Sequence, residues 1–209
     1  ISFPDVDGNG TADVCGRSIQ GIECALSTRS AFAAATLWNG DFSDANGWIT
    51  DAAYWDTVAF PDIDGNGSVD VCGRGKLGIW CALSTGSAFA AATLWNGDFS
   101  DANGWKGDPA YWGTIAFPDV NGNGSADVCG RSAHGIECAV SNGATFSALT
   151  LWNGDFSDAN GWKSEPAYWE TIAFPYLNGN NYADVCGRNA EGIWCAVTKF
   201  RIYLPQLSK

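Results

Sequence analysis

The residues best suited to chemistry are acidic side chains at alternate positions of a Gly-rich stretch, D-x-D-G-N-G-x-x-D, which recurs with variations along the chain. Oxygen donors at this spacing, with Gly allowing a tight turn, suit Ca²⁺, which takes about six to eight oxygen ligands. Mg²⁺ suits them less, because it keeps its waters and demands stricter geometry. The candidate calcium ligands are Asp5, Asp7, Asn9, Thr11 and Asp13; Asp62, Asp64, Asn66, Ser68 and Asp70; and Asp119, Asn121, Asn123, Ser125 and Asp127.

These acidic stretches have other interpretations. They match the first part of an EF-hand loop but lack its final bidentate Glu and the flanking helices, so an EF-hand is not expected. An Asx-rich hairpin without metal is the alternative, although three carboxylates so close together would repel one another without a cation. We expect about three ions, the third bound more weakly because its site has two carboxylates. The fourth copy should hold no ion or hold one weakly, since it reads Tyr176, Asn178, Asn180, Tyr182 and Asp184.

A second group of candidate residues belongs to the stretch LWNGDFSDANGW, which occurs unchanged at Leu37–Trp48, Leu94–Trp105 and Leu151–Trp162. Aromatic rings beside fixed Asp and Asn side chains suit the binding of a sugar. The alternative is structural, with the aromatic rings packed between repeats and S-D-A-N-G forming a turn. The candidate ligand-binding residues are Asp41, Asp44, Asn46, Trp48, Tyr54 and Trp55; Asp98, Asp101, Asn103, Trp105, Tyr111 and Trp112; and Asp155, Asp158, Asn160, Trp162, Tyr168 and Trp169.

Eight Cys form four pairs, and a hairpin about Ile19–Gln20 would bring the first pair face to face. A zinc site would need a C-x₂-C spacing and more than a single His, and redox catalysis would need C-x-x-C or one activated thiol. An even number of Cys points to an oxidising compartment and a secreted protein. We expect the disulfides Cys15–Cys24, Cys72–Cys81, Cys129–Cys138 and Cys186–Cys195. Trp80 and Trp194, which replace Glu23 and Glu137 just before the second Cys, are interpreted as blade-surface residues, with a place at a contact as the alternative, and are not counted among the candidate ligand-binding residues.

The elements that must position these residues repeat with a fixed period. The first Cys of each pair falls at 15, 72, 129 and 186, a step of 57 residues. One repeat domain, 1–209, therefore divides into blades at 1–58, 59–115, 116–172 and 173–209. In the second, strands are expected at Trp55–Ile63, Val69–Arg74, Ile79–Ser84 and Phe89–Trp95, although the Ala run in the last could be helical.

This pattern predicts an all-β protein, a β-propeller of four four-stranded blades. A β-sandwich is the alternative, but it would not need a fixed period. The ring is either closed by this chain or completed by a second chain in a homodimer, because a repeat array must cover its end faces. The fourth copy departs after GIWCAV into TKFRIYLPQLSK, which stands where the last strand of that blade should lie.

Composition limits the partners. The net charge is −12 and no basic run occurs, so nucleic acid and anionic membranes are poor partners. No apolar run is long enough to span a membrane and no signal peptide is present, so a secreted protein would be in its processed form. No catalytic motif occurs, and His134 is interpreted as a surface residue. The candidate sites repeat, which favours binding over catalysis.

The stretch FPDVDGNGTADVCGR at Phe3–Arg17 and its copies resemble the FG-GAP/VCBS class of calcium-binding propeller repeats, which occur in integrin α-subunits and secreted microbial proteins. A group of fungal lectins, the PVL type, has a similar calcium-loop repeat and binds N-acetylglucosamine-type sugars between neighbouring blades. This chain departs from that group in its four units and its Cys. The resemblance implies a secreted, non-enzymatic lectin that binds calcium and, between blades, glycans or glycoproteins. The alternatives are an adhesion or protein-interaction propeller, or an accessory module of a secreted enzyme.

Overall fold

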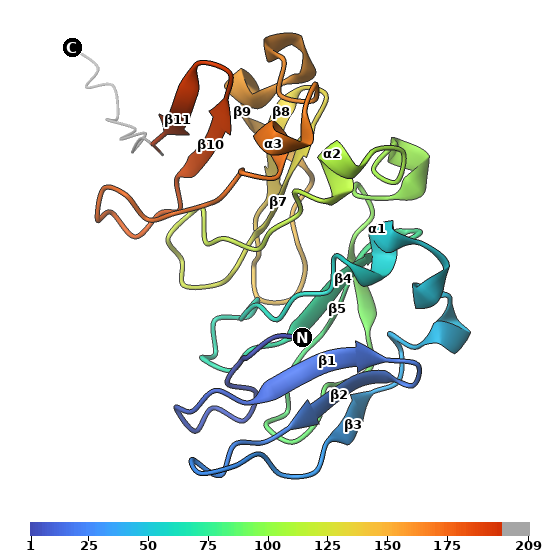
Figure 1. Cartoon of the computed structure of the whole chain (residues 1–209). Coiled ribbons are helices and arrows are strands. Elements are labelled where there is room, and N and C mark those ends of the chain that lie inside the picture. Colours follow the sequence, from blue (N-terminus) through green and yellow to red (C-terminus); the bar gives the residue numbers. More distant parts are fainter. Residues whose placement is uncertain (198–209) are drawn as a thin grey trace, which may run out of the picture.

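The computed structural model describes residues 1–197, which form four small antiparallel sheets (Figure 1). The segment TKFRIYLPQLSK, where the last strand is expected, lies outside the described residues. The sheets follow sequence order: β1 (Val14–Ser18), β2 (Gly21–Ala25) and β3 (Thr36–Asn39); β4 (Val71–Gly75), β5 (Gly78–Ala82) and β6 (Thr93–Asn96); β7 (Val128–Ser132), β8 (Gly135–Ala139) and β9 (Thr150–Asn153); and β10 (Val185–Asn189) with β11 (Gly192–Ala196). We refer to each sheet with the segments around it as units 1 to 4.

Helical turns connect each unit to the next. Each follows the third strand of a unit: α1 (Ala52–Trp55), α2 (Pro109–Trp112) and α3 (Pro166–Trp169), preceded by the 3₁₀ turns η1 (Asp44–Asn46), η2 (Trp48–Thr50), η3 (Asp101–Asn103), η4 (Gly154–Phe156) and η5 (Asp158–Asn160). We call the three connections Asn39–Tyr54, Asn96–Tyr111 and Asn153–Tyr168 the link loops. None of the helices among residues 1–197 is long and apolar enough to cross a membrane.

The cysteine pairing is confirmed. The first two strands of each unit are joined by a two-residue turn, so that Cys15 lies directly opposite Cys24 in the register of β1 and β2. The same register places the other three pairs opposite each other, and all four disulfides are formed. The turn ends on a glycine with φ of +131° in unit 1, Gly21, a conformation that side chains rarely adopt.

The expected first strand of each unit is largely absent. Trp55 ends helix α1 instead of starting a strand, because the carboxylate of Asp51 accepts a hydrogen bond from Ala53 N and caps the helix. The segment after it meets β4 at one antiparallel bridge, in which Ala59 and Cys72 exchange two backbone hydrogen bonds of 2.9 Å. Each of the first three units is therefore a three-stranded sheet with one bridged segment. The strand expected at Phe89–Trp95 begins later, at Thr93, as β6, and the Ala run before it is not helical.

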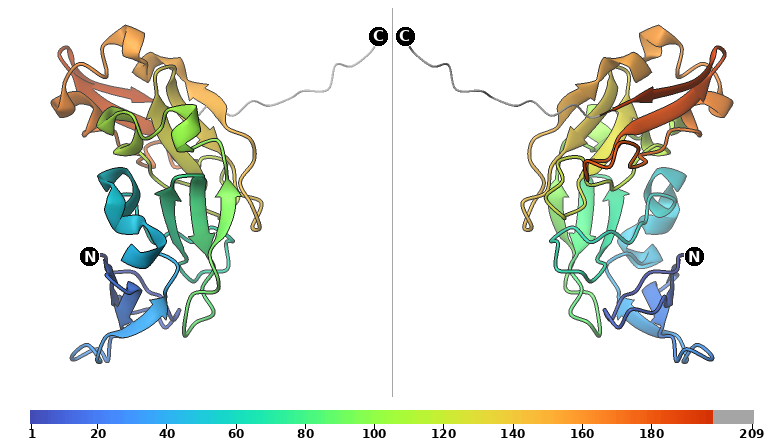
Figure 2. Two further views of the ribbon diagram at one scale, coloured as in Figure 1. Left: turned by 90° about the vertical axis from the view of Figure 1, so that its right-hand side faces the viewer. Right: turned by 90° about the vertical axis from the view of Figure 1, so that its left-hand side faces the viewer.

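The four units succeed one another along a curved array, as Figures 1 and 2 show. The first sheet, in blue, and the fourth, in red, lie at opposite ends of it, and α1, α2 and α3 lie along one side (Figure 1). Residues 1–197 thus form an all-β array of four repeated units, and within this part of the chain no ring is closed. Completion of a ring by a second chain remains a prediction.

Aromatic side chains of the link loops fill the space between units. Trp48 packs on Phe42, with ring centroids 4.6 Å apart, and reaches across to the next unit. There it lies against Gly73 on β4, where an added Cβ would be 2.8 Å from Cζ3 of Trp48. The same Trp–Gly contacts recur between units 2 and 3 and between units 3 and 4, so a glycine on the first strand makes room for each indole. The pairs are Trp105 with Gly130 and Trp162 with Gly187.

Candidate functional site

A buried arginine anchors the second link loop and another anchors the third. Arg74 is fully buried, donates from Nε to Phe99 O at 2.9 Å and forms an ion pair with Asp101. Tyr54, from the preceding link loop, donates its hydroxyl to the other oxygen of Asp101 at 2.6 Å. Burial and this hydrogen bond raise the pKa of Tyr54. The arrangement repeats one unit later in Arg131, Asp158 and Tyr111, with an ion pair of 2.7 Å and a hydroxyl bond of 2.6 Å.

These contacts assign a structural part to one set of the expected ligand-binding residues. Asp101 and Asp158 are engaged by arginine and tyrosine, and Asp44 pairs with Arg17 at 2.6 Å. The arginines themselves were not selected from the sequence. The sequence does contain a sign of their role, since each C-G-R stretch places a charged side chain at the same position of an expected strand.

The aromatic ring of Tyr54 also contacts two cationic side chains. The guanidinium of Arg74 lies 5.5 Å from its centroid, and Nζ of Lys106 lies 5.4 Å from it. Lys106 is held in place by Asp51 at 3.0 Å. Tyr54 therefore serves mainly as a contact between neighbouring loops and cannot be a free aromatic platform.

Other residues of the link loop hold the next unit. The Asp41 carboxylate accepts a hydrogen bond of 2.7 Å from Ala92 N, and Asp98 accepts one of 2.8 Å from Leu149 N. The side-chain amide of Asn46 donates to Gly40 O and Asp41 O at 3.1 and 3.2 Å. Both donor hydrogens of this amide are then used inside the loop, and its carbonyl oxygen is the atom that a ligand can reach.

A cavity opens beside the first link loop, between units 1 and 2, with a volume of about 740 Å³. Four of the six expected ligand-binding residues of this loop line it, and Asp44 and Trp55 do not. The second unit contributes Lys76, Leu77 and Trp80 to its wall. The expected residues in the lining are Asp41, Asn46, Trp48 and Tyr54.

An equivalent cavity of about 580 Å³ lies between units 3 and 4. Its lining again includes four of the six expected residues, Asp155, Asn160, Trp162 and Tyr168. Trp194 occupies the place that Trp80 has in the first cavity, one residue before the second Cys of the hairpin. In the middle link loop, Trp105 is buried and Trp112 packs on the hydrophobic cluster between units 1 and 2.

Trp80 and Trp194 therefore line the two cavities, although neither was among the candidate ligand-binding residues predicted from the sequence. The side chain of Trp194 is 47% exposed, and Trp80 lies over Gly75, where an added Cβ would be 3.1 Å from its Cδ1. The available signal was their departure from the repeat, because units 1 and 3 have Glu at the same position.

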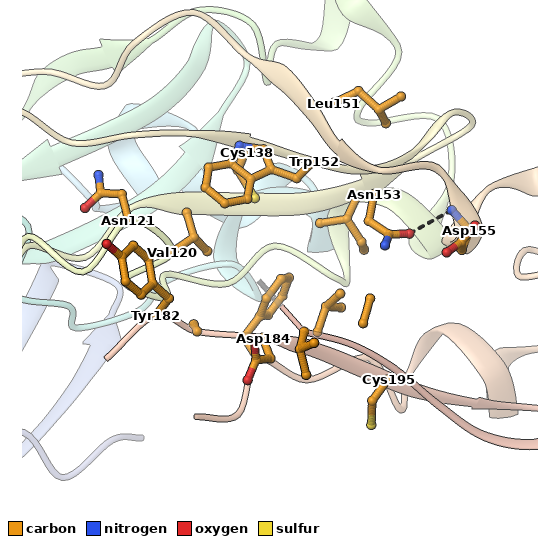
Figure 3. A pocket seen from close by; sticks show the side chains of 16 residues that line it. Val120, Asn121, Cys138, Leu151, Trp152, Asn153, Asp155, Tyr182, Asp184 and Cys195 are labelled. Carbon is orange, nitrogen blue, oxygen red and sulfur yellow. Dashed lines mark hydrogen bonds between the residues drawn. The ribbon is translucent and has the colours of Figure 1, made fainter. Parts of the chain in front are cut away.

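A larger cavity, of about 1090 Å³, also lies between units 3 and 4 and is bordered by Val120, Trp152 and Tyr182 (Figure 3). Its position corresponds to the core of the other contacts between units. Trp38 and Trp95 are each 5% exposed there, covered by Phe89 and Phe146, whereas Trp152 is 39% exposed. We therefore assign this cavity to the core between units.

The acidic turns lie at another part of each unit, between the bridged segment and the first strand. Carboxylate oxygens of Asp5, Asp7 and Asp13 lie within 4.8 Å of one another, and those of Asp62, Asp64 and Asp70 do likewise. Successive turns are in contact, since an added Cβ on Gly65 would lie 2.8 Å from Ser125 Oγ. Burial, together with nearby carboxylates, raises the pKa of Asp70 and of Asp127 to about 6.

Many of these oxygens also accept hydrogen bonds within the turn. In the first turn Gly10 N donates to Asp5 at 2.7 Å. Asp13, from the same turn, accepts a hydrogen bond of 2.7 Å from the backbone N–H of Ser27, which follows β2. Of the other three expected ligands of this turn, Asp7 accepts a hydrogen bond of 2.8 Å from the side-chain amide of Asn9, and Thr11 donates to the amide oxygen of Asn9. In the third turn the amide of Asn123 donates to Ser141 O at 3.2 Å. The fourth turn keeps Asp184, which accepts from Leu177 N at 3.0 Å.

Comparison with known proteins gives one informative relative. No protein-family model matches the chain, and no curated protein matches it. Among solved structures, an Agrocybe aegerita lectin that recognises non-reducing terminal N-acetylglucosamine is similar, with a TM-score of 0.81 and 28% identity over 93% of this chain and 48% of the lectin. The chain thus spans about half the length of that lectin.

Two toxin structures share the fold. The Photorhabdus luminescens Tc holotoxin pore matches with a TM-score of 0.56 and 19% identity over 90% of this chain and 8% of the toxin chain. TcdB2-TccC3 without its hypervariable C-terminal region matches with a TM-score of 0.50 and 17% identity over 90% of this chain and 9% of that chain. The four disulfides are consistent with an extracellular protein. In fold, the chain is similar to part of a lectin that recognises terminal N-acetylglucosamine.

Proposed function

We propose that this protein is a lectin that binds carbohydrate, with terminal N-acetylglucosamine-type sugars as the ligand class, in cavities between its repeated units. The observation that carries the proposal is the recurrence of one cavity at two places, lined by the same loop residues and by a tryptophan of the following unit. The similarity to the Agrocybe aegerita lectin supports the choice of ligand.

The lining of the cavity suits a sugar ring. Trp80 in the first cavity and Trp194 in the second offer an indole face against which the C–H groups of a sugar can stack. The carboxylate of Asp41 and the side-chain carbonyl of Asn46 offer acceptors for hydroxyl or amide hydrogens. Asp41 is fixed by a hydrogen bond from Ala92 N of the next unit, and Asn46 by hydrogen bonds within the loop. An apolar wall with a few fixed polar groups is typical of small-ligand sites.

Binding without catalysis fits the state of the carboxylates. Asp41 accepts a hydrogen bond from the next unit, and Asp101 forms an ion pair with Arg74 and accepts a hydrogen bond from Tyr54. Groups committed to such contacts hold a structure in place and are poorly placed to exchange protons with a substrate. We therefore favour a non-enzymatic glycan-binding protein over an accessory module that takes part in catalysis.

The test is glycan binding by the intact chain and by two matched variants. Trp194→Ala should remove binding at the cavity between units 3 and 4 at little cost in stability, because this side chain is 47% exposed. Trp55→Ala is the control, since Trp55 is 43% exposed and lies outside the lining. A glycan array and calorimetric titration with an N-acetylglucosamine oligosaccharide measure the difference. Absence of binding to any glycan by the intact chain would contradict the proposal.

We also propose that the first two acidic turns bind Ca²⁺, and that the third binds it more weakly. The residues present fit such an ion, because two groups of three carboxylates are gathered and only oxygen donors are offered. When bound, Ca²⁺ would neutralise carboxylates that otherwise repel one another within each turn. Val6 O accepts a hydrogen bond of 3.1 Å from Ser84 in the next unit, so that the turn also supports the contact between units.

A further inference from the structure

We propose that the contacts between units fall into two classes, set by the residue just before the second Cys, and that only those with Trp at this position bind the sugar. This inference rests on the proposed carbohydrate function and concerns its valency. The link loop LWNGDFSDANGW is the same at all three contacts, but the sheet that faces it is not. We name the contacts 1–2, 2–3 and 3–4 after the units that they join.

The register of the sheets places this residue against the loop. At contact 1–2, Trp80 is paired across the strands with Gly73, the glycine over which Trp48 lies. At contact 3–4, Trp194 is paired with Gly187, which faces Trp162. In both places the residue before the second Cys therefore stands next to the loop tryptophan and lines the cavity.

Contact 2–3 differs at this point. The loop tryptophan, Trp105, lies over Gly130 as at the other contacts, but the cross-strand partner of Gly130 is Glu137. A second substitution accompanies the first. The position of Gly75, over which the Trp80 indole lies, is occupied by Ser132 at contact 2–3.

The two substitutions are physically linked. An added Cβ at Gly75 would be 3.1 Å from Cδ1 of Trp80, so a side chain at this position crowds the indole. Where the residue is Glu, a Ser can stand beside it. In unit 1, Ser18 Oγ donates to Glu23 at 3.0 Å. Units 1 and 3 thus have the pair Ser/Glu and unit 2 has the pair Gly/Trp, whereas unit 4 combines Trp194 with Asn189.

The consequence for binding follows from the chemistry of the two side chains. An indole offers a polarizable face to the C–H groups of a sugar and loses little on desolvation. A carboxylate offers no such face, so at Glu137 the sugar ring has no aromatic surface on which to stack. The loop is unchanged, so it does not by itself determine whether a contact binds. We infer two binding sites among the described residues, at contacts 1–2 and 3–4, and none for the neutral sugar at contact 2–3.

The experiment is a count of sites by calorimetric titration of the full chain with an N-acetylglucosamine oligosaccharide. Wild type should bind two per chain. The double variant Ser132→Gly/Glu137→Trp recreates the Gly75/Trp80 pair at contact 2–3 and should bind three. Trp80→Ala should bind one. The control is Ser18→Gly/Glu23→Trp, which makes the same change in unit 1, whose sheet faces no link loop among residues 1–197, and this variant should still bind two.

A cooperative melting transition in each variant shows that it is folded. Three equal sites in wild type, or two sites in a folded Ser132→Gly/Glu137→Trp variant, would overturn the inference and leave the lectin function standing. A wild-type chain that binds no saccharide would overturn the lectin proposal and the inference together.

Discussion

At the scale of single residues, tryptophans from two parts of the repeat serve two different purposes. Trp48 and its copies are buried between units, and each depends on a glycine that faces it. Trp80 and Trp194 stand at the cavities and are partly open to solvent. The buried arginines of the C-G-R stretches, Arg74 and Arg131, form ion pairs with aspartates of the link loops. Substitutions at these positions should therefore separate stability from binding.

Gly73→Ala tests the contact between Trp48 and the next unit. The added Cβ would lie 2.8 Å from the Trp48 ring, so we expect a loss of about 1–3 kcal/mol in the free energy of unfolding from overpacking. Gly16→Ala is the matched control at the same position of unit 1, where the nearest atom would be 3.6 Å away. Urea unfolding of both variants gives the comparison, and equal stability of the two would contradict this packing.

Arg74→Ala tests the buried ion pair. Arg74 is fully buried, and removing it leaves the Asp101 carboxylate without its cation, which we expect to cost about 3–5 kcal/mol of unfolding free energy. Arg188→Ala removes the equivalent arginine of unit 4, which is exposed, and should cost less than about 1 kcal/mol. The prediction fails if chemical denaturation gives the two variants the same stability.

At the scale of elements, the two loops of each unit have separate tasks. The link loop joins consecutive units and forms one wall of the cavity, whereas the acidic turn gathers carboxylates within itself and contacts the turn of the next unit. The link loop is held by side-chain hydrogen bonds and ion pairs of its own. We expect the acidic turns, by contrast, to depend on a cation for their full stability.

The pH dependence of calcium stabilisation tests this dependence. The pKa of Asp70 and Asp127 is raised to about 6, above the ordinary value of about 3.9. In the calcium-free protein these two carboxyl groups therefore lower the free energy of unfolding as pH rises from about 4 to 6. The full loss is present above pH 6, where both groups are charged in the folded state. Calcium binds the deprotonated form, so the increase in Tm that it causes should be larger at pH 7.5 than at pH 5.

Thermal melting with calcium and with EDTA at the two pH values measures this effect. Asp64→Asn should reduce the increase in Tm at pH 7.5, because it removes one carboxylate of the second turn. Asp56→Asn is the control, since Asp56 is exposed and belongs to neither acidic group. An increase in Tm that is absent, or that is the same at both pH values, would count against bound calcium.

At the scale of the whole molecule, the repeat places two equivalent cavities on one array of units. Two sites on one body should bind a surface dense in terminal N-acetylglucosamine more tightly than either site binds the free sugar, by a factor of about 10² or more. Trp194→Ala should reduce binding to such a surface to the level of a single site, while Trp55→Ala should not. Surface plasmon resonance at high and low glycan density would show this, and density-independent binding would contradict it.

The sequence predicted the period, the repeated units and the disulfides, because these depend on short-range register, as at Cys15 and Cys24. It failed at Trp55–Ile63, where the cap formed by Asp51 makes a helical turn in place of the strand's beginning. Asp44 was predicted to bind ligand and Trp80 was not, whereas Asp44 pairs with Arg17 and Trp80 lines the first cavity. The partner of Asp44 is Arg17, 27 residues earlier, and the role of Trp80 depends on Trp48 in the preceding link loop. Such long-range contacts have no local signal.

The most direct test of the central claim, that sugars bind between units beside Trp80 and Trp194, is a titration followed by the indole N–H signals in a ¹H–¹⁵N spectrum. Of the 11 Trp in the chain, these two should show the largest saturable shifts on addition of an N-acetylglucosamine oligosaccharide, and Trp55 should show none. Shifts confined to other tryptophans, or no saturable shift at all, would contradict the claim.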